Sequence, residues 1–122
     1  MRFPTVTVAA GTILLAIIIA MTTLDWSHSI LNSANYRLLS LSRSERTREL
    51  TRVVGQECHG IEAFYMGMPT QGFVAGAAFW SLRCQDGRTF AILINPDSEG
   101  TSVVVSCNML AQYTQATCFH RF

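Results

Sequence analysis

The longest uncharged run of this chain lies near its N-terminus and limits what the remainder can be. No residue from Val6 to Leu24 is charged, and the middle of the run contains only Ile, Leu and Ala. A helix rises about 1.5 Å per residue, so this run would span roughly 28 Å, close to a hydrocarbon core of about 30 Å. Asp25 and Trp26 then end the run with an acid and an interfacial aromatic ring. The sequence predicts a transmembrane helix over residues 6–24, preceded by a short cytoplasmic N-terminus, residues 1–5.

A cleaved signal peptide is the alternative for the same run. Arg2 and the terminal amine would supply its positive start, but the run exceeds the usual apolar core of roughly 7–15 residues. No good Ala-x-Ala cleavage site follows, and the nearest substitute is Ser27-His28-Ser29. A retained anchor is the favoured interpretation, which makes the lipid bilayer the first predicted partner.

The cysteines indicate on which side of the membrane the rest of the chain lies. All four come after residue 57, and none forms a Cys-x-x-Cys pair: Cys58, Cys84, Cys107 and Cys118. An even number of cysteines in a short domain behind an export-type helix is typical of disulfides in an oxidising compartment. The prediction is a single-pass protein of the bacterial inner membrane with its C-terminal domain in the periplasm.

The spacing of the cysteines leaves two pairings open. In a regular meander, Cys84 and Cys107 would lie on strands that flank a middle strand, about 9–10 Å apart. A disulfide needs Cα atoms within about 7 Å, so these two can pair only beyond the strand ends. The local pairing of Cys58 with Cys84 and of Cys107 with Cys118 is preferred.

Helix and strand signals follow residue 42. Ser42-Arg43-Ser44-Glu45 fits a capping box, in which the serine hydroxyl and the glutamate carboxylate each bind an unpaired backbone N–H. The helix is expected to end near Val54, because Gly55 is a typical stop. Asp86-Gly87 is a two-residue hairpin turn between apolar stretches. Strands are expected over residues 73–84, 88–95 and 101–107, and a short helix over residues 108–115.

The predicted fold class is α+β. A single N-terminal transmembrane helix is followed by a small domain, residues 43–122, with one helix and an antiparallel β-meander. A core of this size usually needs covalent support, which two disulfides would supply. Residues 25–42, rich in Ser and Asn, are expected to form a juxtamembrane stalk, and residues 60–72, interrupted by glycines, an irregular loop.

Several classes of chemistry lack their motifs. A formal charge of +1 with 14% charged residues argues against a nucleic-acid binder. Glu57-Cys58-His59 lacks the first cysteine of a haem c motif, because position 55 is Gly, and no cysteine knuckle for zinc is present. There is also no Gly-x-Ser-x-Gly and no phosphate-binding glycine loop. We therefore expect no enzyme activity, no cofactor, no metal and no small-molecule substrate.

Two groups of residues are candidates for a docking surface. Tyr65, Met66 and Met68 belong to an aromatic and methionine cluster of a kind enriched at protein interfaces. The alternative is that they form the core of the small sheet. Arg46 and Arg48 belong to an arginine-rich stretch that would suit anionic lipid or an acidic partner. Interleaved glutamates favour instead a solvated helix face with ion pairs.

These features predict a non-catalytic accessory or scaffolding subunit of a bacterial inner-membrane complex, bound to other membrane-protein subunits. The alternative is a membrane-anchored or secreted periplasmic domain that binds or inhibits a soluble partner. The segment from Trp80 to Ile94, a strand ending in Cys84, an Asp-Gly turn and a strand with an aromatic residue, is similar to membrane-bound lysozyme inhibitors of the periplasm. The inhibitory loop motif of that family is missing, so no family is assigned.

Overall fold

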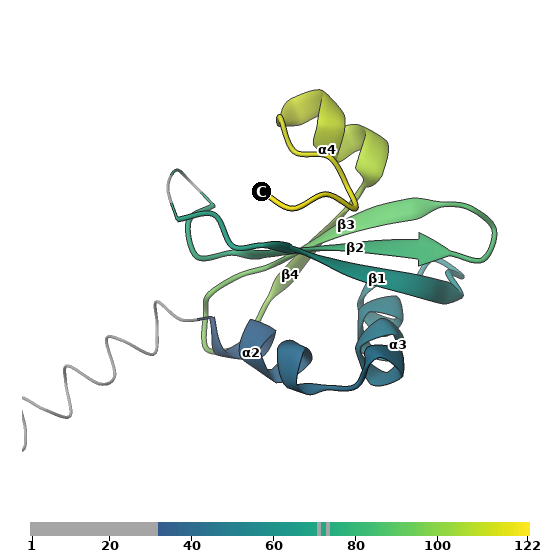
Figure 1. Cartoon of the computed structure of the whole chain (residues 1–122), viewed down its shortest axis with the longest axis horizontal. Helices are drawn as coiled ribbons and strands as arrows, with labels where there is room; N and C mark the ends of the chain where they lie inside the picture. Colours follow the sequence, from purple (N-terminus) through teal and green to yellow (C-terminus); the bar gives the residue numbers. More distant parts are fainter. Residues whose placement is uncertain (1–31, 71, 73) are drawn as a thin grey trace, which may run out of the picture.

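The computed structural model describes residues 32–70, 72 and 74–122, which form a four-stranded sheet with helices on both faces (Figure 1). The strands are antiparallel and pair in the order β1-β2-β3-β4. The elements are α2 (Ser33–Ser40), α3 (Arg43–Val54), β1 (Gly60–Gly67), β2 (Ala78–Cys84), β3 (Thr89–Ile94), β4 (Ser102–Ser106) and α4 (Cys107–Tyr113). The prediction of a small α+β domain with an antiparallel sheet is confirmed.

The predicted helix at the start of the domain is confirmed as α3. The Ser42 hydroxyl accepts a hydrogen bond from the Glu45 N–H at 3.3 Å, and Gly55 follows the last turn with a φ of 61°. Leu50 and Val54 are buried, whereas Val53 is 44% exposed. The three predicted strands correspond to β2, β3 and β4, and the predicted C-terminal helix to α4.

The prediction of an irregular loop over residues 60–72 is wrong, because residues 60–67 form strand β1. Gly60, at the start of this strand, reflects close approach between elements and not a break in the strand. A Cβ at Gly60 would collide with the side chains of Thr51 and Leu82, so only glycine lets β1 pass this close to α3.

The structure also contains one helix, α2, that the sequence did not predict. The stretch expected as a stalk includes α2, whose N-terminal cap Asn32 accepts a hydrogen bond from the Asn35 N–H. Asn32 and Asn35 are buried, and Leu38 and Leu39 pack against the core. These contacts make α2 part of the folded domain. Local propensity did not indicate this helix, because a helix this short depends on tertiary contacts for its stability.

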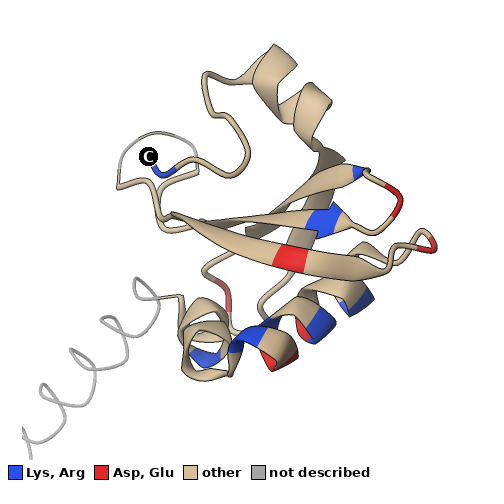
Figure 2. Cartoon of the chain, turned by 45° about the vertical axis from the view of Figure 1, so that its right-hand side comes forward, with Lys and Arg blue, Asp and Glu red and all other residues tan. Residues whose placement is uncertain are grey.

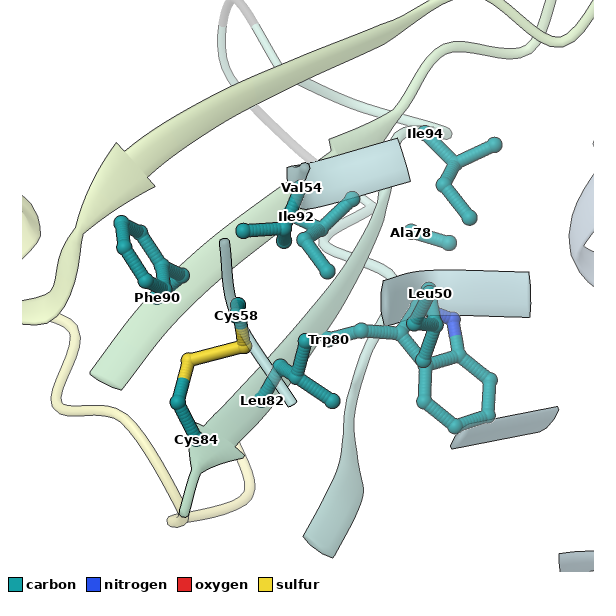
Figure 3. Packing of buried hydrophobic residues seen from close by; sticks show 10 residues of the cluster. All are labelled: Leu50, Val54, Cys58, Ala78, Trp80, Leu82, Cys84, Phe90, Ile92 and Ile94. Atoms are coloured by element: carbon teal, nitrogen blue, oxygen red, sulfur yellow. A yellow bond between two sulfur atoms is a disulfide. The ribbon is translucent and has the colours of Figure 1, made fainter. Parts of the chain in front are cut away.

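The core consists of two apolar layers, one on each face of the sheet. The layer beneath α2 and α3 centres on Trp80, Leu82 and Ile92, each at most 1% exposed (Figure 3). The layer beneath α4 and the C-terminal segment includes Phe79 and Leu110. Alternation along β2 and β3 supplies both layers, so the sheet is buried on both faces.

Two disulfides are present, as predicted. Cys58 and Cys84 join the segment before β1 to the end of β2, with Cα atoms 5.3 Å apart. Cys107 and Cys118 join the start of α4 to the C-terminal segment, with Cα atoms 5.8 Å apart.

The predicted transmembrane helix over residues 6–24, the N-terminus before it and residues 25–31 of the predicted stalk lie outside the described residues. In the part of the chain that the structure describes, no helix has the length and apolar character needed to cross a membrane.

Candidate functional site

The aromatic and methionine cluster proposed from the sequence as a docking surface lies mostly inside the domain. Met66 is only 1% exposed, and Met68 packs against the core. The Tyr65 hydroxyl accepts a hydrogen bond from Asn35 Nδ2 at 3.1 Å, and its ring centroid lies 4.8 Å from that of Trp80. These residues therefore build the core, which was the alternative interpretation of the same cluster.

The two arginines proposed for docking have different positions. The Arg46 guanidinium donates to the carbonyls of Leu39 and Leu41 at 3.3 and 2.9 Å, and it lies 5.8 Å from the centre of the Trp80 ring. Arg46 therefore fixes the corner between α2 and α3. Arg48 is exposed and remains available to a partner, although a single surface arginine does not make a site.

Strand β1 forms one edge of the sheet, and several features block it against further pairing. Its register with β2 shifts between Gly60 and Glu62 and again before Gly67, and such bulges twist an edge out of line. Glu62 places a charge on the strand, which also discourages pairing. The Phe122 N–H donates to the Met66 carbonyl at 3.1 Å, so the C-terminus occupies part of this edge.

Strand β4 forms the opposite edge and has none of these protections. Its sequence from Ser102 to Ser106 is Ser-Val-Val-Val-Ser, without charge, proline or glycine. It pairs with β3 in unbroken register from Phe90 opposite Ser106 to Ile94 opposite Ser102. Charged residues lie on the helices, on the turns and on strands β1 and β2, whereas β4 has none (Figure 2). Proteins usually protect such an edge, because an exposed regular edge pairs readily with other strands.

The backbone groups of β4 that point away from the sheet can be identified. The Asn95 N–H donates to the Thr101 carbonyl at 2.8 Å, which makes this a hydrogen-bonded pair next to the turn. Backbone groups alternate in direction along an antiparallel strand. Val103 therefore bonds to β3, whereas Ser102 and Val104 direct their N–H and C=O groups outward. Among the described residues, these outward groups have no backbone partner.

An apolar groove lies beside this edge, between α2, α3 and the turn that joins β3 to β4. Its volume is about 550 Å³, and one wall ends at Ser102. The charged residues of its lining are Arg37 and Glu49. Most of the other lining side chains are apolar: Ala34, Leu38, Leu41, Leu50, Val53 and Ile94. We call β4 together with this groove the β4 edge site.

A turn held by Asp97 sets the position of β4. The Asp97 carboxylate accepts hydrogen bonds from the Thr101 hydroxyl and, at 3.0 Å, from the Thr101 N–H. These bonds lower the pKa of Asp97 below its usual value of 3.8. The ionised carboxylate therefore stabilises the turn that leads directly into the edge strand.

The β4 edge site combines two features that strand addition requires. Outward N–H and C=O groups offer backbone hydrogen bonds, and the adjacent groove offers apolar surface to alternate side chains of an added strand. The predicted meander already placed residues 101–107 on an outer strand of the sheet. The groove beside this strand was not predicted, because α2, which lines it, was expected to be part of a stalk. The absence of charge and proline from residues 102–106 was the signal that could have indicated an open edge.

Other sites receive less support from the structure. In the described part of the chain, no three His, Cys, Asp or Glu side chains gather closely enough to hold a metal ion. An open groove between α3 and β1 is lined in part by Arg43, Arg48 and His59, and among the described residues no buried side-chain N or O atom without a hydrogen-bond partner belongs to its lining. Comparison of the chain with protein families, with curated proteins and with solved structures finds no significant match.

Proposed function

We propose that the protein is a non-catalytic scaffolding subunit that binds an extended strand of a partner along β4. The observation that carries this proposal is the regular, uncharged edge of β4 beside an apolar groove, an edge that no strand of residues 32–70 or 74–122 pairs with from outside the sheet. The outward backbone groups of Ser102 and Val104 need partners of complementary geometry, and an added strand supplies them. Such a strand gains main-chain hydrogen bonds from the edge and side-chain burial from the groove.

The anchor predicted over residues 6–24 gives this binding a location. In the proposal, the helix holds the domain at the periplasmic surface of the bacterial inner membrane, and the partner belongs to a complex in the same membrane. The two disulfides support a compartment that is oxidising, because cytosolic thiols are normally kept reduced.

Site-specific cross-linking in native membranes tests the proposal. A photoreactive amino acid replaces Val103 of the full chain, which is 49% exposed on β4, and the control replaces Ile61, which is 60% exposed on the blocked β1 edge. We expect a discrete cross-linked product from position 103 and none from position 61. Equal products from both edges, or none from position 103, would contradict the proposal.

Two substitutions at Ser102 show whether the product depends on backbone pairing. Ser102→Pro removes an outward N–H at the first residue of an edge strand, where proline is tolerated. Ser102→Ala keeps this N–H and serves as the control. The proposal expects the cross-linked product to disappear with Ser102→Pro and to persist with Ser102→Ala. If both variants behave alike, the docking does not use this edge.

The alternative partner for this site is a soluble periplasmic protein, and the same experiment distinguishes it from a membrane-protein subunit. A product that survives replacement of residues 6–24 by an unrelated membrane span and fractionates with soluble periplasmic proteins would identify a binder or inhibitor. A product that remains with the membrane fraction supports the accessory subunit.

A further inference from the structure

We infer that the strand received by the β4 edge site is β4 of a second copy of this chain. This inference rests on the proposed function, because it names the partner of the same edge. It gives a homodimer in which one continuous antiparallel sheet runs through both domains.

The sequence of β4 is self-complementary. Ser102-Val103-Val104-Val105-Ser106 reads the same in both directions about Val104. In an antiparallel pair of identical strands centred on Val104, serine lies opposite serine and valine opposite valine. A symmetric dimer interface requires such a surface, since the same patch must be complementary to itself.

The direction of the backbone groups fits the same arrangement. Val104 points its N–H and C=O outward, so two copies can exchange both hydrogen bonds at the symmetry axis. The outward N–H of Ser106 can donate to the outward carbonyl of Ser102 in the other copy. No like charges meet, because β4 contains none.

Pairing about this axis also suits a membrane-anchored protein. Residues directly opposite one another in an antiparallel pair project from the same face of the sheet. Both copies would therefore present α2 and α3 on one side. Asn32, where the described chain begins, precedes α2 on this side (Figure 1). If both copies are anchored in one bilayer, their N-terminal segments must leave the sheet on the same side, as they do in this arrangement. Pairing with an unrelated strand would not require this.

The interface formed by two short strands is small, and the membrane compensates for this. Stable dimers in solution usually bury about 1,200–2,000 Å² in total, more than two short edge strands can cover. Confinement of both copies to one membrane raises their effective concentration without new contacts. The dimer is therefore expected from the full chain in a membrane, and the experiment uses the full chain.

Engineered cysteines test this pairing in vesicles that contain the full chain. In the dimer, Val104 lies opposite Val104 with Cα atoms about 5.5 Å apart, within the range of a disulfide. Val103 of one copy lies opposite Val105 of the other, so the two Val103 residues are offset by two positions along the strands. Their Cα atoms are then more than about 7 Å apart, too far for a disulfide. We expect Val104→Cys to give a covalent dimer on oxidation and Val103→Cys alone to give none.

The Val104 side chain packs against the core, so Val104→Cys could fail to dimerise through a packing defect alone. A mixture of two variants at other positions provides an independent test. Vesicles containing both Val103→Cys and Val105→Cys chains should form a covalent dimer that neither variant forms alone. Adding Ser102→Pro to either system should abolish the dimer, which excludes random collision as its cause.

The outcomes separate the two proposals. If the membrane cross-link at position 103 captures a different protein while neither cysteine system forms dimers, strand docking holds and the second-copy inference is wrong. Absence of the cross-link at position 103 together with absence of dimers would overturn both proposals. A dimer from Val103→Cys alone that equals the dimer from Val104→Cys would contradict the proposed register.

Discussion

The Trp80 indole Nε1 donates a hydrogen bond to Asn35 Oδ1 at 2.7 Å, within the core and across 45 positions of sequence. Asn35 also donates through Nδ2 to the Tyr65 hydroxyl, so one buried side chain ties α2 to both β1 and β2. Asn32 adds bonds from Nδ2 to the carbonyls of Gly76 and Ile94 at 3.0 and 2.8 Å. This network attaches α2 to the sheet, and other residues of α2 line one side of the groove beside β4.

Removal of the Asn35 amide should destabilise the domain strongly. Asn35→Ala leaves the buried Trp80 N–H without its acceptor, which typically costs about 1–3 kcal/mol in the free energy of unfolding. Urea denaturation of the full chain in mild detergent, followed by tryptophan fluorescence, measures this cost. Asn108→Ala, an exposed position in α4, is the control and should change stability by less than about 0.5 kcal/mol. Equal losses from both variants would mean that the network is not structural.

Two neighbouring positions on α3 separate folding from docking. Leu50 is fully buried, so Leu50→Ala should cost about 2–5 kcal/mol in the free energy of unfolding. Val53 is 44% exposed at the groove, so Val53→Ser should leave stability within about 1 kcal/mol. We expect Val53→Ser nevertheless to weaken the cross-link from position 103. Unchanged cross-linking in a folded Val53→Ser chain would show that the groove takes no part in docking.

The two disulfides should contribute unequally. In the chain-entropy account, the bond between Cys58 and Cys84, separated by 26 positions, contributes about 3.5 kcal/mol. The bond between Cys107 and Cys118, separated by 11 positions, contributes about 2.8 kcal/mol. Denaturation of the paired alanine variants measures both, and a fully reduced chain should be less stable than either. A reduced chain as stable as the oxidised one would contradict the assigned pairs.

The turn before β4 should make stability depend on acid pH. Because hydrogen bonds lower the pKa of Asp97 in the folded state, its contribution is present above pH about 4 and is lost as the pH falls through the folded pKa. Asp97→Asn should therefore reduce stability at neutral pH and flatten its decline below pH about 4. Asp86→Asn, at the opposite hairpin, is the comparison, since hydrogen bonds from Arg88 also lower the pKa of Asp86. Only the Asp97 variant should also weaken the cross-link from position 103.

Local signals in the sequence predicted the elements whose cause is local. The capping box gave the start of α3, and the Asp-Gly turn gave the hairpin of β2 and β3. The number of cysteines indicated two disulfides, because an exported small domain needs covalent support. Each of these features depends on residues close together in the chain or on composition alone.

Long-range contacts account for what the sequence did not show. Strand β1 was not predicted, because its glycines indicated a loop. The structure shows that packing of β1 against α3 requires glycine at position 60. Helix α2 was not predicted, because its polar residues indicated an exposed stalk. Asn32 and Asn35 are buried instead, since they form hydrogen bonds with distant segments. The predicted meander placed residues 101–107 at the edge of the sheet, but the groove beside β4 depends on α2, which the sequence did not predict.

Amide hydrogen exchange at Val104 tests the central claim most directly, because this N–H points away from its own sheet. In the full chain in membranes, strand docking predicts that the Val104 amide is protected as strongly as that of Val103, and that Ser102→Pro abolishes protection at Val104 only. A Val104 amide that exchanges as fast as an exposed loop amide, while Val103 remains protected, would show that no strand pairs with β4.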